Sequence, residues 1–167
     1  MNRDAGGLGR LLTAPVASVL DKVLRTPRLA RAPIGVYRAG MGFLFGSRML
    51  MLEHIGRNSG QRRYVVLEVI AHESPDSYII ASGFGESAQW FRNVMAQPRV
   101  RISTGRRNTV PAQARRLTAA EADAALSTYI ERHPRAWSAL KSVIADSLDG
   151  RVEPPGTELP LVELTVR

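Results

Sequence analysis

The chain alternates between short apolar runs typical of strands and longer stretches with apolar positions three and four apart, which are typical of helices. After residue 48 the short runs are rich in Val, Ile and aromatic residues, and Gly, Pro, Asn, Asp or Ser interrupt them. This pattern predicts six strands, at residues 49–52, 64–70, 78–82, 99–104, 108–116 and 160–166.

Helical spacing occurs before, between and after these strands. The pattern predicts helices at 14–24, at 88–97 and over much of 118–148, where Thr118 and Glu121 form a capping box. A weaker helix is predicted at 34–45, which contains three glycines. Two hairpins and no regular βαβ alternation favour antiparallel pairing. We therefore predict a mainly β fold, a six-stranded antiparallel barrel, closed or partly split, with flanking α-helices.

Charge is unevenly distributed, although the 167 residues are enough for one domain with a buried core. The formal net charge is +8, and residues 1–48 carry eight basic and two acidic side chains. No zinc spacing or helix-turn-helix pattern accompanies the charge, so we do not expect nucleic-acid binding. No apolar run approaches the roughly 18 residues of a membrane span, and the start does not resemble a secretory signal. The sequence thus predicts a cytoplasmic protein.

The chain divides into a basic amphipathic segment, residues 1–46, and a barrel domain, residues 47–167. One hypothesis places the segment on the anionic inner face of the cell membrane, where basic residues contribute roughly 1 kcal/mol each. The alternative is that it packs on the barrel as an ordinary helix with solvated arginines. Gly35, Gly40 and Gly42 would serve close packing equally well.

The turn Gly56–Arg63 is the strongest candidate for a binding site. Its glycines allow a backbone with φ > 0, and successive N–H groups in such a loop can form an anion-binding concavity. Its three arginines are forked donors that suit phosphate and carboxylate. The alternative is a polar hairpin turn with solvated arginines.

Other chemistries find less support. The chain has no cysteine, and its three histidines are far apart, so no metal site is expected. Glu68 lies in an apolar strand: pointing inward it would be a candidate functional group, and pointing outward, which we favour, it would be a solvated strand residue.

Three motifs resemble those of the deazaflavin-dependent nitroreductase family. Gly56–Arg63 resembles its Gly-Arg-Lys-Ser/Thr-Gly-Gln-Pro-Arg segment, and Ala81–Gly85 its Ser-x-Gly loop. Gln89–Asn93 and Gln97–Val100 resemble its Trp-Tyr-x-Asn helix and the exit that follows. The order is the same, and the resemblance covers about residues 47–117.

The resemblance implies a split β-barrel, similar to FMN-binding split barrels, that binds reduced coenzyme F-420. It also implies hydride transfer from this deazaflavin to a small-molecule acceptor: a quinone, a nitroaromatic or an activated alkene. The coenzyme carries a phosphodiester and an oligoglutamate tail, and the arginine turn would bind this polyanion. The implied cofactor-binding residues are Arg57, Asn58, Ser59, Gly60, Gln61 and Arg62; Leu67, Glu68 and Val69; Ile79, Ile80, Ala81, Ser82 and Gly83; and Gln89, Trp90, Phe91, Arg92 and Asn93.

This sequence departs from the family pattern in ways that leave the substrate open. Asn58 stands where lysine is frequent, Gly83 where nitro-reducing members often carry another lysine, and Phe91 replaces a tyrosine. Ser82 is a candidate for supplying a proton to the reduced acceptor, with solvent as the alternative. The rival hypotheses are a non-catalytic protein that binds F-420 or FMN, and a basic accessory protein on a membrane.

Overall fold

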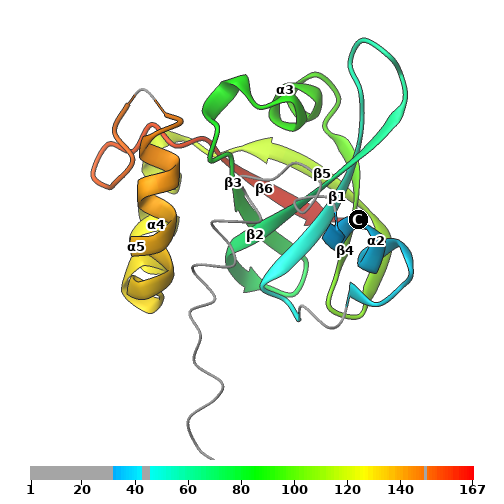
Figure 1. Ribbon diagram of the computed structural model, residues 1–167, viewed down its shortest axis with the longest axis horizontal. Coiled ribbons are helices and arrows are strands. Elements are labelled where there is room, and N and C mark those ends of the chain that lie inside the picture. Colours follow the sequence, from blue (N-terminus) through cyan, green and yellow to red (C-terminus); the bar gives the residue numbers. More distant parts are fainter. Residues whose placement is uncertain (1–31, 43–45, 149) are drawn as a thin grey trace, which may run out of the picture.

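The computed structural model describes residues 32–42, 46–148 and 150–167, and their strands close into a barrel (Figure 1). Around the barrel the order is β1-β2-β3-β6-β5-β4, and β4 pairs with β1 to close it. Every neighbouring pair is antiparallel, so the predicted six-stranded antiparallel barrel is confirmed. The strands are β1 (Met49–Ile55), β2 (Arg62–Ser74), β3 (Ser77–Ala81), β4 (Arg99–Thr104), β5 (Arg107–Arg116) and β6 (Leu161–Val166).

The hairpin between β1 and β2 extends past the end of the barrel. β1 pairs with β2 along its whole length, from Met49 to Ile55, but with β4 only from Met51 to Glu53. The last residues of β1 and the turn that follows therefore stand above the barrel beside α3 (Gln89–Ala96), as Figure 1 shows.

Two apolar clusters stabilise the domain, one inside the barrel and one on its outer side. Alternate residues of each strand face opposite sides of the sheet, so every strand can contribute to both. Leu50, Leu52 and Ile80 are fully buried inside. The outer cluster joins the strands to α4 (Ala119–Arg132) and α5 (Pro134–Ala145), with Leu126 and Leu161 at its centre.

The capping box at the start of α4 is formed as predicted. The Glu121 amide donates to Thr118 Oγ1, and the Thr118 amide donates to a Glu121 carboxylate oxygen. The pKa of Glu121 is lowered to about 2, chiefly by hydrogen bonds from Arg115 and then from Thr118. This helix end is therefore fixed by side chains, as expected for a first turn whose amides lack helical partners.

The described part of the N-terminal segment packs on the barrel. The helix expected at 34–45 is α2 (Ala32–Arg38), and it ends before Gly40, whose φ is +75°. Tyr37 is buried, which raises its pKa to about 12, and its hydroxyl donates to the Met49 carbonyl at 2.7 Å. A Cβ on Gly42 would lie 2.4 Å from the Tyr37 ring, so this glycine permits the close approach.

The predicted helix at 14–24 falls outside the described residues. Among the described helices, none has the length and apolar character that crossing a membrane requires.

Candidate anion-binding groove beside the arginine turn

The turn between β1 and β2 is closed by its own backbone. The Gly56 amide donates to the Gln61 carbonyl at 2.8 Å, and the Gly60 amide donates back to the Gly56 carbonyl at 2.8 Å. Gly60 has a φ of +65°, a conformation that glycine adopts without strain. The amides of Ser59 and Gln61 also donate within the turn. These amides are therefore engaged, and the predicted concavity of free N–H groups is wrong; the side chains carry the anion-binding capacity.

Arg57 is held against α3 by three hydrogen bonds. Its amide and its NH1 group both donate to Asn93 Oδ1, at 3.1 and 2.9 Å, and NH1 also donates to Gln89 Oε1 at 3.1 Å. Both acceptors are uncharged, so the positive charge of Arg57 is not cancelled. The Nε and NH2 groups have no hydrogen-bond partner within the part of the chain that the structure describes. The fold thus unites residues from two of the sequence motifs and leaves one edge of the guanidinium available.

Asn93 is buried beneath the turn. Only 4% of Asn93 is exposed, and its Nδ2 group donates to Nδ1 of His54, which is also 4% exposed, at 3.3 Å. Burial lowers the pKa of His54; a backbone hydrogen bond with Ile55 opposes this, and the charge of Arg63 adds to it. Sequence reasoning expected Asn93 as a cofactor contact and gave His54 no role, because a lone histidine near a strand end carries no distinguishing pattern.

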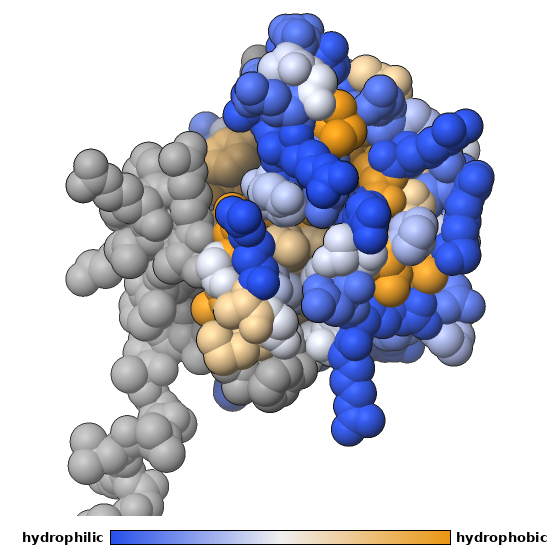
Figure 2. Space-filling model, turned by 90° about the vertical axis from the view of Figure 1, so that its right-hand side faces the viewer, coloured by the Kyte–Doolittle hydropathy of each residue, from blue (hydrophilic) through white to orange (hydrophobic). Residues whose placement is uncertain are grey.

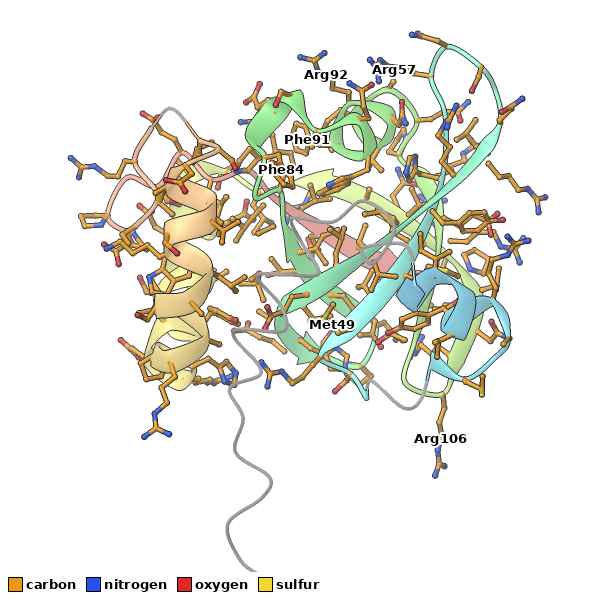
Figure 3. The ribbon with its side chains drawn as sticks, in the orientation of Figure 1. Met49, Arg57, Phe84, Phe91, Arg92 and Arg106 are labelled. Carbon is orange, nitrogen blue, oxygen red and sulfur yellow. The ribbon has the colours of Figure 1, made fainter. Side chains whose placement is uncertain are left out.

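A groove with a volume of about 480 Å³ lies beside α3. Arg57 and Arg92 lie at this end of the molecule, while Arg106 projects from the opposite end (Figure 3). The groove is lined by Arg57, Glu86, Phe91, Arg92, Met95 and Arg116. Three arginines against one glutamate leave an excess of positive charge. Met95 is 36% exposed here.

Arg116 and Glu86 are residues that the sequence analysis missed. Arg116 ends β5, and Glu86 lies in the short 3-10 helix η2 (Gly85–Ser87). Their side chains form an ion pair at 2.5 Å, and the Arg116 guanidinium lies 5.7 Å from the centre of the Phe91 ring. Arg92 Nε donates to the Glu86 carbonyl at 3.1 Å. Pairing of β5 with β4 brings the end of β5 to the helix that precedes β4, since the Ala114 amide donates to the Pro98 carbonyl.

Arg62 lies on the other face of the hairpin. It pairs in register with Ile55, and its Nε lies 3.5 Å from a carboxylate oxygen of Glu53. Arg63, one residue later, pairs in register with His54 on the side of α3. Arg57 and Arg62 therefore lie on different faces of the hairpin. That both contact the cofactor stays a prediction.

The predicted contacts in β2 and β3 lie mostly in the core. Leu67 and Val69 pack against the cluster inside the barrel, where Ile80 is fully buried, and Ile79 and Ala81 pack against the outer cluster. These side chains form the walls of the barrel and do not line the groove. Trp90 packs against the inner cluster and meets the edge of Phe91, with the two ring centres 5.9 Å apart.

Ser82 and Gly83 lie in the loop after β3. Ser82 is fully buried, and its hydroxyl donates to the Gly85 carbonyl at 2.7 Å. Its proton is therefore engaged inside the protein. A Cβ on Gly83 would contact Ile144 of α5 at 3.5 Å, so this loop is covered by that helix.

Glu68 points outward, but it is not a solvated strand residue. Its carboxylate accepts a hydrogen bond from the Tyr129 hydroxyl at 2.8 Å and pairs with Arg48 at 3.2 Å, and its side chain is 17% exposed. Burial, and then the charge of Glu68, raise the pKa of Tyr129. The contact joins β2 to α4, so the alternative of a carboxyl group inside the barrel is wrong.

Comparison with protein families identifies one match. The model of the family described as F420H(2)-dependent quinone reductase matches residues 25–144. The matched region contains the turn, α3 and the groove. None of the curated proteins matches the chain.

Several solved structures share the fold. A structure titled as a domain-swapped dimer is 20% identical, with a TM-score of 0.52, and the match covers 71% of this chain and 81% of the other. One titled "Structure of F420-H2 Dependent Reductase (FDR-A)" is 21% identical, with a TM-score of 0.50, and the match covers 70% and 93%. A protein of unknown function from Agrobacterium tumefaciens is 19% identical, with a TM-score of 0.52, and the match covers 86% and 58%. At such identities the likeness shows the barrel fold alone.

Proposed function

The chain belongs to the F420H(2)-dependent quinone reductase family and is therefore a deazaflavin-dependent oxidoreductase, and we propose that its arginine groove binds the anionic tail of the coenzyme. A quinone is the acceptor that the family description implies. Nitroaromatics and activated alkenes are further proposed acceptors, and Ser82, whose buried hydroxyl donates to the Gly85 carbonyl, is a proposed proton donor.

The observation that carries the proposal is the state of Arg57. Its NH1 group is occupied by the neutral acceptors Gln89 and Asn93, so its position is fixed while its charge is kept. The Nε and NH2 edge that remains is the planar fork that binds a phosphate or carboxylate in a bidentate manner. Arg92 and Arg116 extend the positive charge along the same groove.

The donor set fits the polyanionic tail. When bound, the reduced coenzyme supplies a hydride. The contribution of this chain is to bind and orient: Arg57, Arg92 and Arg116 are placed to hold anionic groups. Asn58, Ser59 and Gln61 are exposed at the turn and provide further polar contacts. A fixed orientation lowers the entropic cost of bringing the reactants together.

A fluorescence titration with coenzyme F-420 and, in parallel, with FMN tests this function. We expect F-420 to bind at micromolar concentrations or below and FMN to bind more weakly, because FMN lacks the oligoglutamate tail. Turnover with a quinone is measured as the loss of the reduced coenzyme. Tight FMN binding with no response to F-420 would refute the assignment of the groove, and binding without turnover would indicate a non-catalytic cofactor-binding protein.

We also propose that the basic segment at residues 1–46 brings the protein to an anionic membrane surface. The support is the excess charge of that region and the described surface next to α2. Arg38, Arg62 and Arg101 are exposed on that side, and Glu53, beside Arg62, is only 8% exposed. Strongly hydrophilic side chains dominate this view of the molecule (Figure 2).

Cosedimentation with vesicles distinguishes the membrane proposal from packing on the barrel. The full chain and a chain lacking residues 1–31 are compared on vesicles with and without anionic lipid. We expect only the full chain to pellet, and only with anionic vesicles. Equal pelleting of both chains, or of neither, would show that this segment is not the anchor.

A further inference from the structure

The buried pair His54 and Asn93 has a defined hydrogen-bond direction. Two donors of Arg57 point at Asn93 Oδ1, so the amide NH2 group of Asn93 must face His54. Nδ1 of His54 must then be the acceptor, which places the ring proton on Nε2. The arrangement of Arg57 is thus compatible with neutral His54 in one tautomer.

We propose that neutral His54 is a positioning residue, which holds the Arg57 guanidinium toward the groove by fixing the orientation of the Asn93 amide. This proposal rests on the proposed function, because it takes the anionic tail of the coenzyme as the ligand of Arg57. His54 itself, 4% exposed, touches neither coenzyme nor acceptor in this role.

Protonation of His54 would oppose this arrangement. Nδ1 would become a donor that faces the Asn93 NH2 group, also a donor. Rotation of the amide would satisfy His54, but it would turn the NH2 group toward the two donors of Arg57. Arg57 would then keep only Gln89 as a partner among the described residues. The guanidinium edge would no longer be fixed.

The surroundings make His54 the group that titrates. The charged side chains that face the pair are Arg57 from the turn and Arg63 from β2. From α3 the facing groups are the amides of Asn93 and Gln89, which are neutral. The arrangement is therefore complete at neutral pH. It should be lost on acidification, at a pH below the ordinary histidine value of 6.5 because burial lowers the pKa of His54.

The first test follows the full chain by NMR without any ligand. In the natural protein we expect the backbone amide of Arg57 and the side-chain NH2 of Asn93 to shift together, with one midpoint below pH 6.5 that matches the titration of His54. His54→Asn keeps an acceptor atom at the position of Nδ1 but cannot titrate, so both signals should stay constant. The control is His72→Asn, at an exposed histidine bonded to the Ser77 carbonyl. In this variant the Arg57 and Asn93 signals should shift with pH as they do in the natural protein.

The second test measures the dissociation constant for F-420 at pH 8 and pH 5. The loss of affinity on acidification is compared between variants, because protonation of the coenzyme is common to all of them. We expect the loss on acidification to be about tenfold greater in the natural protein than in His54→Asn, as for one charge-assisted contact. Equal losses, or an Arg57 amide that ignores the titration of His54, would overturn the proposal.

A second variant covers the case in which His54→Asn does not fold. In Asn93→Asp the carboxylate can accept hydrogen bonds from both Arg57 and protonated His54. The midpoint of the His54 titration should therefore rise, and Arg57 should stay in place in acid. An unchanged midpoint would overturn the proposal. If no variant binds F-420 at any pH while the NMR signals remain coupled, the proposed function fails and the positioning role of His54 stands.

Discussion

Arg57→Ala is the substitution that tests the groove most directly. The side chain donates through NH1 to Gln89 and Asn93 and leaves its Nε and NH2 edge for a ligand. Alanine removes the charge and the fork, and it also releases the side chain's hold on α3. We therefore expect weaker binding of coenzyme F-420 with little change in the fold, because Arg57 is exposed.

The magnitude follows from the contact that would be lost. A hydrogen bond to a charged group contributes about 1.5–3 kcal/mol, so the dissociation constant should rise by about 10- to 150-fold. Arg57→Lys keeps the charge but replaces the planar fork by a point charge, so its loss should be intermediate. The difference between the natural protein and Arg57→Ala should shrink as salt increases, because ions screen exposed charges beyond about 8 Å at physiological ionic strength.

The assay is a fluorescence titration at low and high salt, with circular dichroism to confirm the fold. Arg106→Ala is the matched control, since Arg106 is an exposed arginine at the opposite end of the molecule (Figure 3). If Arg57→Ala binds F-420 as tightly as Arg106→Ala does, at both salt concentrations, the turn is a hairpin connection and the tail binds elsewhere.

Three further substitutions test the scaffold. Tyr129→Phe removes the hydrogen bond to Glu68 and should lower the free energy of unfolding by about 1 kcal/mol in urea denaturation. Thr118→Ala removes the cap of α4 and should cost a similar amount, about 1 kcal/mol, measured in the same way. The pKa of Glu163 in the folded protein is lowered below 4.5, chiefly by the hydrogen bond from Ser77. The ionised Glu163 carboxylate therefore stabilises the fold fully above pH 4.5, and this stabilisation is lost as the pH falls through the lowered pKa. Glu163→Gln should therefore lose less stability than the natural protein between pH 7 and pH 3.

The barrel could be predicted from sequence because its signals are local. Alternating apolar residues, a Gly-rich turn and a capping box each act within a few residues, and each is found where it was expected. The length of β2 was underestimated, since Arg62–Ser74 includes polar ends and two register shifts that an apolar pattern does not reveal.

The groove could be predicted only in part, because its residues come from four separate segments: the turn, η2, α3 and the end of β5. Arg57 was found from the turn, and Arg92 was found from the helix motif. Arg116 and Glu86 come from segments that carry no motif, and only the register between strands places them together. Ile79 and Ile80, which the resemblance implies as cofactor contacts, face opposite sides of the sheet: Ile79 faces the helices and Ile80 the barrel interior.

The two arginines that the sequence analysis treated as equivalent differ in the partners that the hairpin gives them. Arg62 has a charged partner, because its Nε lies 3.5 Å from a carboxylate oxygen of Glu53. Arg57 is fixed by the neutral amides of Gln89 and Asn93, which hold the guanidinium without neutralising it. The turn therefore directs its uncompensated charge toward α3, and a buried amide is better suited to this task than a carboxylate would be. A carboxylate at position 93 would hold Arg57 more strongly, but it would reduce the attraction between the groove and an anionic ligand.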